Sequence, residues 1–118
     1  MNDEAQAIIK QLRQLGTAQN RKVWARHGAP ETYLGVSFAQ LEKIKQKLVH
    51  EYKATPEKQH TLALALWATE VCDAQLLAAV LADPQCLSKA QAKRMLRPVT
   101  FYLILNYLGG LFARAPFA

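Results

Sequence analysis

His60-Thr-Leu-Ala-Leu-Ala-Leu-Trp-Ala-Thr-Glu70 is the stretch around which the rest of this chain is organised. Its residues from Leu62 to Leu66 are all apolar, and Trp67 follows directly. The preceding Thr55-Pro56-Glu57 predicts a helix start, because Thr is a good N-cap, Pro fits the first turn and an acid complements the helix dipole. A helix that is apolar on every side belongs in a protein interior. We therefore expect this helix to be central, with Trp67 in the core.

A second apolar run covers residues 74–82, between Asp73 and Asp83-Pro84. Asp73 is the expected N-cap of this helix, and Pro84 closes it. Two short helices joined by a tight turn are the unit from which helical arrays are built. Helical spacing and capping patterns predict further helices on both sides, and we find no strand alternation. The sequence predicts an all-α fold, with a single domain over residues 1–118 and further helices near 5–15, 18–27, 37–51, 88–97 and 99–108.

The composition indicates a basic globular domain. Half of the residues are hydrophobic (51%), and the formal net charge is +6. A basic surface suits a polyanion, which means nucleic acid first and an anionic membrane second, although such a charge also serves solubility.

The cysteines and the apolar segments bear on the compartment. Cys72 and Cys86 form no CxxC motif and have no His at zinc spacing, so we expect both to be small core residues in a reducing compartment. The N-terminus lacks the features of a signal peptide, and the longest apolar run, Val99–Leu105, is too short to span a bilayer. We expect a cytoplasmic protein without a membrane partner.

Basic residues cluster on two of the expected helices, and the sequence contains no Asp or Glu after Asp83. A four-residue spacing places such side chains along one helix face. The two clusters could form one positive surface that contacts phosphates, or they could be two solvated helix faces. They consist of Arg21, Lys22 and Arg26 on the first helix and Lys89, Lys93 and Arg97 on the second.

No common catalytic motif occurs, whether of serine hydrolases, zinc proteases, phosphate-binding loops or dinucleotide-binding folds. The scattered histidines His27, His50 and His60 are expected to be structural. Tyr102 and Asn106 stand four residues apart and therefore share a helix face. In an otherwise apolar helix, Asn106 must either find hydrogen-bond partners or face a cleft.

Three segments together resemble a known family: Gly16–Gly28, the helix start at Phe38 after Gly35-Val-Ser37, and Leu62–Thr69 with its continuation to Pro84. They are similar to the DNA alkylation repair family, the AlkD-like glycosylases built from HEAT-like repeats. The resemblance implies a HEAT-like α-solenoid of antiparallel helical pairs whose basic concave face holds duplex DNA. It also implies removal of purines alkylated at N3 or N7, without a metal or an organic cofactor.

The chain departs from the family pattern at the position of the catalytic Asp. The matching aromatic and acidic positions are Tyr102 and Asn106, and Asn carries no charge. As a cationic base leaves, positive charge builds on the sugar, and a carboxylate beside it stabilises that charge. Asn106 can hold a water molecule but cannot offset the charge. The sequence therefore predicts weak or absent glycosylase activity at the Tyr102–Asn106 site.

Members of this family are longer, so the resemblance also implies that the chain is a truncated array. Its last helices would then expose an apolar face, for which we expect a homo-oligomer through the C-terminal end. Two alternatives remain open. One is a non-catalytic HEAT-like module that binds protein or DNA, and the other is a membrane-surface role for the helix expected over 99–108.

Overall fold

Seven α-helices make up the described part of the chain, which in the computed structural model is residues 2–96 and 101–116, without the side chains of Tyr102 and Leu103. No strand occurs among these residues, so the fold is all-α, as the sequence predicts. The helices are α1 (Asp3–Leu15), α2 (Ala18–Ala25), α3 (Phe38–Glu51), α4 (Pro56–Ala68), α5 (Cys72–Leu81), α6 (Lys89–Leu96) and α7 (Tyr102–Ala113).

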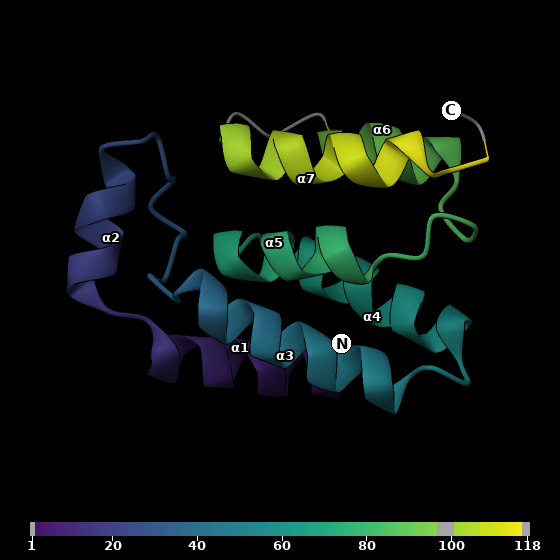
Figure 1. Ribbon diagram of the computed structural model, residues 1–118, viewed down its shortest axis with the longest axis horizontal. Helices are drawn as coiled ribbons and strands as arrows, with labels where there is room; N and C mark the ends of the chain where they lie inside the picture. The colour runs from purple at the N-terminus through teal and green to yellow at the C-terminus, as the bar shows by residue number, and fades with distance from the viewer. Residues whose placement is uncertain (1, 97–100, 117–118) are drawn as a thin grey trace.

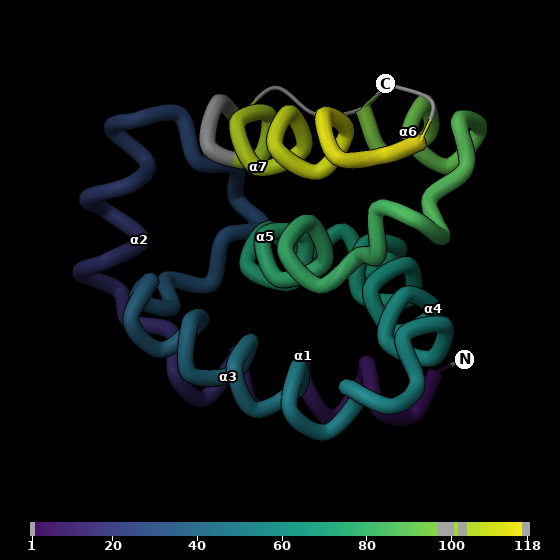
Figure 2. The backbone as a smooth tube through the Cα atoms, turned by 45° about the vertical axis from the view of Figure 1, so that its right-hand side comes forward, coloured from purple at the N-terminus to yellow at the C-terminus, as the bar shows by residue number. Residues whose placement is uncertain are grey.

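Six of the helices stack as three layers of two (Figure 1). The layers are α1 with α3, α4 with α5, and α6 with α7, and the two helices of the middle layer run in opposite directions. In this view α3, α5 and α7 lie in front and α1, α4 and α6 lie behind. Helix α2 stands apart at one end of the stack, which the turned view also shows (Figure 2). The arrangement is that of a solenoid-like helical array.

Helix α5, and not α4, is the central helix. Eight of its ten residues are buried, and it packs against α1, α3, α4 and α7. In α4 only four of thirteen residues are buried, while Leu64 and Trp67 are half-buried. The expectation that the helix of His60–Glu70 is the central one, with Trp67 in the core, was therefore wrong. Helix α4 instead lies in the rear row of the stack, with one side open to solvent.

The helix starts follow the predicted capping patterns except at α4 and α5. The hydroxyls of Thr17 and Ser37 each accept the backbone N–H three residues later, at 3.1 and 3.3 Å. Ser88 and Gln91 form a complete capping box, with reciprocal bonds of 3.1 and 3.0 Å. Helix α4 begins after Thr55 as expected, but the Thr55 hydroxyl makes no capping bond.

Asp73 is not the N-cap of α5, because Val71 occupies that position and Asp73 lies within the first turn. Its carboxylate is fully buried and accepts two backbone N–H groups from a distant loop, from Leu34 at 2.6 Å and from Val36 at 3.0 Å. Burial raises the pKa of Asp73, and these N–H bonds offset part of that rise. The side chain therefore fastens the loop before α3 to the central helix.

The expectation that both cysteines are core residues holds for Cys72 and fails for Cys86. Cys72 is buried, and burial raises the pKa of its thiol to about 12, but Cys86 is exposed and its thiol donates to Asp83. Helix α7 continues through Gly109 and Gly110 without interruption. No helix within the described residues is long and apolar enough to cross a bilayer.

Candidate nucleic-acid interface

Helix α2 carries the first basic cluster. Arg21, Lys22 and Arg26 are all exposed, and the helix has no buried residue. Its main apolar contact is made by the half-buried Trp24, whose ring packs edge-on against Phe38 with centroids 5.2 Å apart. Burial therefore contributes little to the position of this helix.

Polar bonds to the following loop hold α2 instead. The Asn20 amide donates to the Tyr33 hydroxyl at 3.3 Å and to the Gly35 carbonyl at 3.1 Å. The Arg21 guanidinium donates to the Leu34 carbonyl at 3.2 Å, so one of its N–H groups has a structural partner while the side chain stays exposed. Hydrogen bonds to the loop, rather than packing in a hydrophobic core, therefore determine the position of α2 and of its cations.

The loop itself is rigidly connected to the rest of the molecule. Buried Tyr33 donates its hydroxyl to the Val36 carbonyl at 3.1 Å, and burial raises the pKa of Tyr33 to about 12. Gly35 has a φ of 90°, and a Cβ there would lie 2.3 Å from the Thr17 carbonyl oxygen. The chain from Asp73 through this loop to α2 is therefore a continuous hydrogen-bonded connection. This connection could not be predicted from the sequence, because its partners lie far apart along the chain.

The second basic cluster lies on α6, where Lys89 and Lys93 are exposed. Arg94 is exposed as well, although the sequence pattern did not single it out, and Arg97 lies outside the described residues. Figures 1 and 2 place α2 and α6 at opposite ends of the molecule, so the two clusters do not lie side by side.

The described cations of α2 and α6 have no ion-pair partner among the described residues. Among residues 2–96 and 101–116 the one ion pair is Lys45–Glu42, at 3.6 Å. No carboxylate of the described chain therefore neutralises α2 or α6. A surface of this kind can bind phosphates, which need little more than correctly spaced Lys and Arg.

His60 is a structural residue that connects α4 to the start of α6. It is 6% exposed, and its Nδ1 accepts the Asp83 N–H at 3.0 Å. Its Nε2 therefore donates to the Gln91 side chain, at 3.2 Å. The described residues contain no group of three His, Cys, Asp or Glu side chains that could hold a metal ion.

Asn106, which we expected from the sequence resemblance to match the family's catalytic acid, is exposed on α7. Ile104, Leu108 and Leu111 are buried, and the helical repeat places Asn106 on the face opposite to them. The alternative of a buried, hydrogen-bonded Asn is therefore wrong. Tyr102 is the first residue of α7, and its side chain is outside the described residues.

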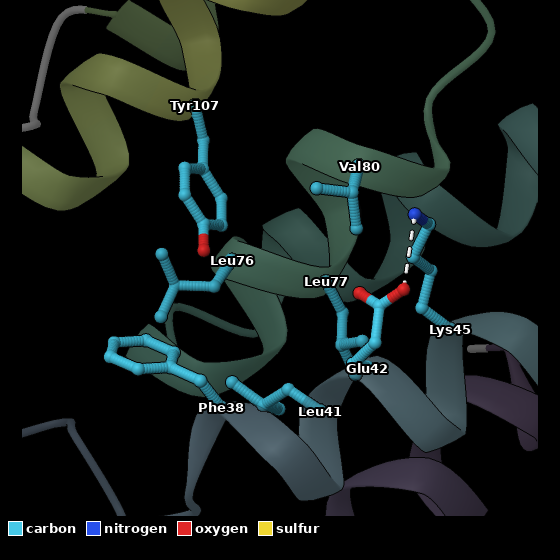
Figure 3. A pocket seen from close by; sticks show the side chains of 8 residues that line it. All are labelled: Phe38, Leu41, Glu42, Lys45, Leu76, Leu77, Val80 and Tyr107. Atoms are coloured by element: carbon cyan, nitrogen blue, oxygen red, sulfur yellow. Dashed lines mark ion pairs between the residues drawn. The ribbon is translucent and has the colours of Figure 1, made fainter.

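The neighbouring residue, Tyr107, lines a shallow pocket that the sequence did not indicate. Its ring points from α7 toward Leu76 and Phe38, so three layers of the stack meet there (Figure 3). Phe38, at the start of α3, is 37% exposed. The pocket is apolar apart from the Tyr107 hydroxyl and one ion pair, and its lining consists of Phe38, Leu41, Glu42, Lys45, Leu76, Leu77, Val80 and Tyr107.

Comparison with known proteins gives one finding. A family model described as "DNA alkylation repair enzyme" matches residues 8–104, which is most of the chain. No curated protein and no solved structure matches it. The matched region contains both basic helices and ends inside α7.

Proposed function

This chain belongs to the DNA alkylation repair enzyme family, and on that basis we propose that it binds duplex DNA through the exposed cations of α2 and α6. The observation that carries the proposal is the absence of any carboxylate partner for these cations within the described chain. The formal net charge of +6 adds a long-range attraction to a polyanion.

The dimensions of the molecule suit a duplex that runs along its long axis. The chain extends 39 × 28 × 25 Å, and α2 and α6 lie toward opposite ends of the longest dimension. One turn of B-DNA spans about 34 Å, so phosphates one turn apart could meet both clusters. The same spacing lets one HEAT-like unit over residues 1–118 act as a single DNA-binding domain.

A salt titration tests this assignment. Each lost phosphate contact should make the plot of log affinity against log salt shallower by about 0.9. Lys89→Glu with Lys93→Glu should reduce both the affinity and the slope. The matched control, Lys10→Glu with Lys58→Glu, makes the same charge change at exposed positions on α1 and α4. Equal losses of DNA affinity in both double variants would show that binding depends only on the net charge of the protein. That result would contradict a defined DNA-binding surface.

The same proposal includes N-glycosylase activity on N3- or N7-alkylated purines that is weak or absent. Catalysis would need a charge beside the deoxyribose as the cationic base departs, and the uncharged Asn106 cannot supply it. Release of 7-methylguanine from methylated duplex DNA should be slow and unchanged by Asn106→Ala. If Asn106→Asp raises the rate while DNA affinity stays constant, the site is assigned to α7. Efficient release that Asn106→Ala removes would contradict the proposal.

A second candidate function is a non-catalytic HEAT-like interaction module, and the open last layer of the stack favours it. Leu96 on α6 is 48% exposed and Leu105 on α7 is 37% exposed. Apolar surface at the end of an array is normally covered by another repeat or another chain. Self-association through this end should appear as concentration-dependent sedimentation that Leu105→Glu reduces. A monomer at all concentrations would exclude a homo-oligomer.

A further inference from the structure

A second hollow lies on the rear side of the stack, away from the pocket of Figure 3. It is formed between α4 and α6, which both lie behind their layer partners in Figure 1. Neither of the lysines assigned to DNA lines it: the helical repeat places Lys89 and Lys93 on a different side of α6. Its lining consists of Leu64, Trp67 and Ala68 from α4 and Gln91, Arg94 and Met95 from α6.

The α4 side of the hollow is apolar and partly open to solvent. Leu64 and Ala68 are one turn apart and share a face, and Trp67 stands beside them. Leu64 and Trp67 are half-buried and Ala68 is exposed, although all three belong to the most apolar stretch of the sequence. A half-exposed Trp in an apolar hollow is the kind of side chain that anchors protein interfaces.

The α6 side adds a positive charge and no negative one. Arg94 is exposed and has no ion pair with any described residue. The Gln91 side-chain oxygen is already engaged by the Ser88 N–H and by His60. No Asp or Glu lines the hollow, and none follows Asp83 in the sequence. The hollow is therefore complementary to a ligand that is apolar at its centre and acidic at its edge.

We propose that the α4–α6 hollow docks an acidic amphipathic helix of a protein partner. Apolar side chains of that helix would pack on Leu64 and Trp67, and a carboxylate would pair with Arg94. A furrow between two helices accepts a third helix in a recurring mode of recognition. Nucleic acid is disfavoured here, because a phosphate backbone needs several cations in a row and the hollow offers one. This surface is independent of the DNA-binding proposal.

The probe is a fluorescein-labelled synthetic helix with Leu at i, i+4 and i+7 and Glu on its remaining faces. Two companion peptides replace the Leu residues by Ser or the Glu residues by Lys. Fluorescence anisotropy should show that the Leu/Glu peptide binds the full chain at least about tenfold more tightly than either companion. Because the chain has two Trp residues, Trp24→Phe leaves Trp67 as the one reporter. Its emission should shift to shorter wavelength on binding.

Arg94→Glu should weaken the Leu/Glu peptide about tenfold, because it replaces an attractive pair by a repulsive one. Lys93→Glu is the matched control, with the same charge change one residue away and outside the hollow, and should weaken binding less than about twofold. Both positions are exposed, so neither variant endangers the fold. Equal effects of the two variants would overturn the proposal, as would equal binding of the Ser peptide. Competition by short single-stranded DNA that depends on Arg94 would instead assign the hollow to nucleic acid.

Discussion

The middle layer and the α2 end of the molecule are held in place by different forces. Eight of ten residues of α5 are buried, whereas α2 has none. The middle layer therefore depends on apolar burial, which is non-directional and large in sum. Helix α2 depends on a few directional hydrogen bonds that start from Asp73. Helix α2, one of the two helices proposed to meet DNA, is thus the element whose position is easiest to change without unfolding the core.

The largest effect is expected from a cavity in the middle layer. Leu81 is fully buried at the end of α5. Leu81→Ala should lower the free energy of unfolding by about 2–5 kcal/mol, because it removes buried methylene groups and leaves a cavity. Val23→Ala in α2, at a side chain that is 43% exposed, is the control and should change it by less than about 0.5 kcal/mol. Urea denaturation measures both, and similar losses would refute the contrast between the two regions.

Asp73→Asn should have the next largest effect on the free energy of unfolding, because Asp73 joins the middle layer to the loop that holds α2. The amide keeps one acceptor oxygen but turns an NH₂ group toward one of two N–H donors, those of Leu34 and Val36. Leaving a buried donor unpaired costs about 1–3 kcal/mol. Hydrogen exchange should show that α2 and the loop are deprotected more than α4. Uniform deprotection of the whole chain would mean that Asp73 stabilises the core and has no separate effect on the position of α2.

The same variant should change the pH dependence of stability. Burial raises the pKa of Asp73 above its ordinary value of 3.8 in the folded chain. Between that value and the raised one, the folded state holds this proton more firmly than the unfolded state. The contribution of Asp73 is therefore most favourable below pH 3.8 and falls as the pH rises through the folded pKa. The difference in unfolding free energy between wild type and Asp73→Asn should shrink along that path, and a difference that grows would contradict the sign.

A smaller effect should follow from loosening α2 alone. Asn20→Ala removes the bonds to the Tyr33 hydroxyl and the Gly35 carbonyl. We expect a loss of about 1 kcal/mol in stability, the usual net worth of such bonds. Affinity for duplex DNA should fall as well, although no charge has changed, because the cations of α2 lose their fixed position. Unchanged DNA affinity would show that α2 makes no phosphate contact.

Features that depend on residues close together in the chain, such as helix starts, could be predicted from the sequence. Capping boxes such as Ser88–Gln91 fixed helix starts, because both partners lie within one turn. The role of Asp73 could not be predicted, since a carboxylate near a helix start looks the same whether it caps locally or bonds to a loop far away in the chain. Asn106 was correctly placed on a helix, but its exposure depends on which side of α7 the core lies. The position of Tyr107 in a pocket could not be predicted, because that pocket is formed by residues of three layers that are far apart in the sequence.

Two further effects, no larger than that of Asn20→Ala, are expected from backbone strain at the turns of the two regions. Glu70, between α4 and α5, has a φ of 62°, and Gly28, after α2, has a φ of 90°. An L-residue in this left-handed region costs about 1–2 kcal/mol, while Gly loses about 0.5–1 kcal/mol of entropy elsewhere, so Glu70→Gly should stabilise the chain by about 0.5 kcal/mol. Gly28→Ala should destabilise it by about 1 kcal/mol, although a Cβ there meets nothing within 4 Å. Thermal denaturation resolves both shifts. If Glu70→Gly is destabilising instead, the Glu70 side chain contributes more to the α4–α5 turn than its backbone strain costs, and the middle layer is not held by burial alone.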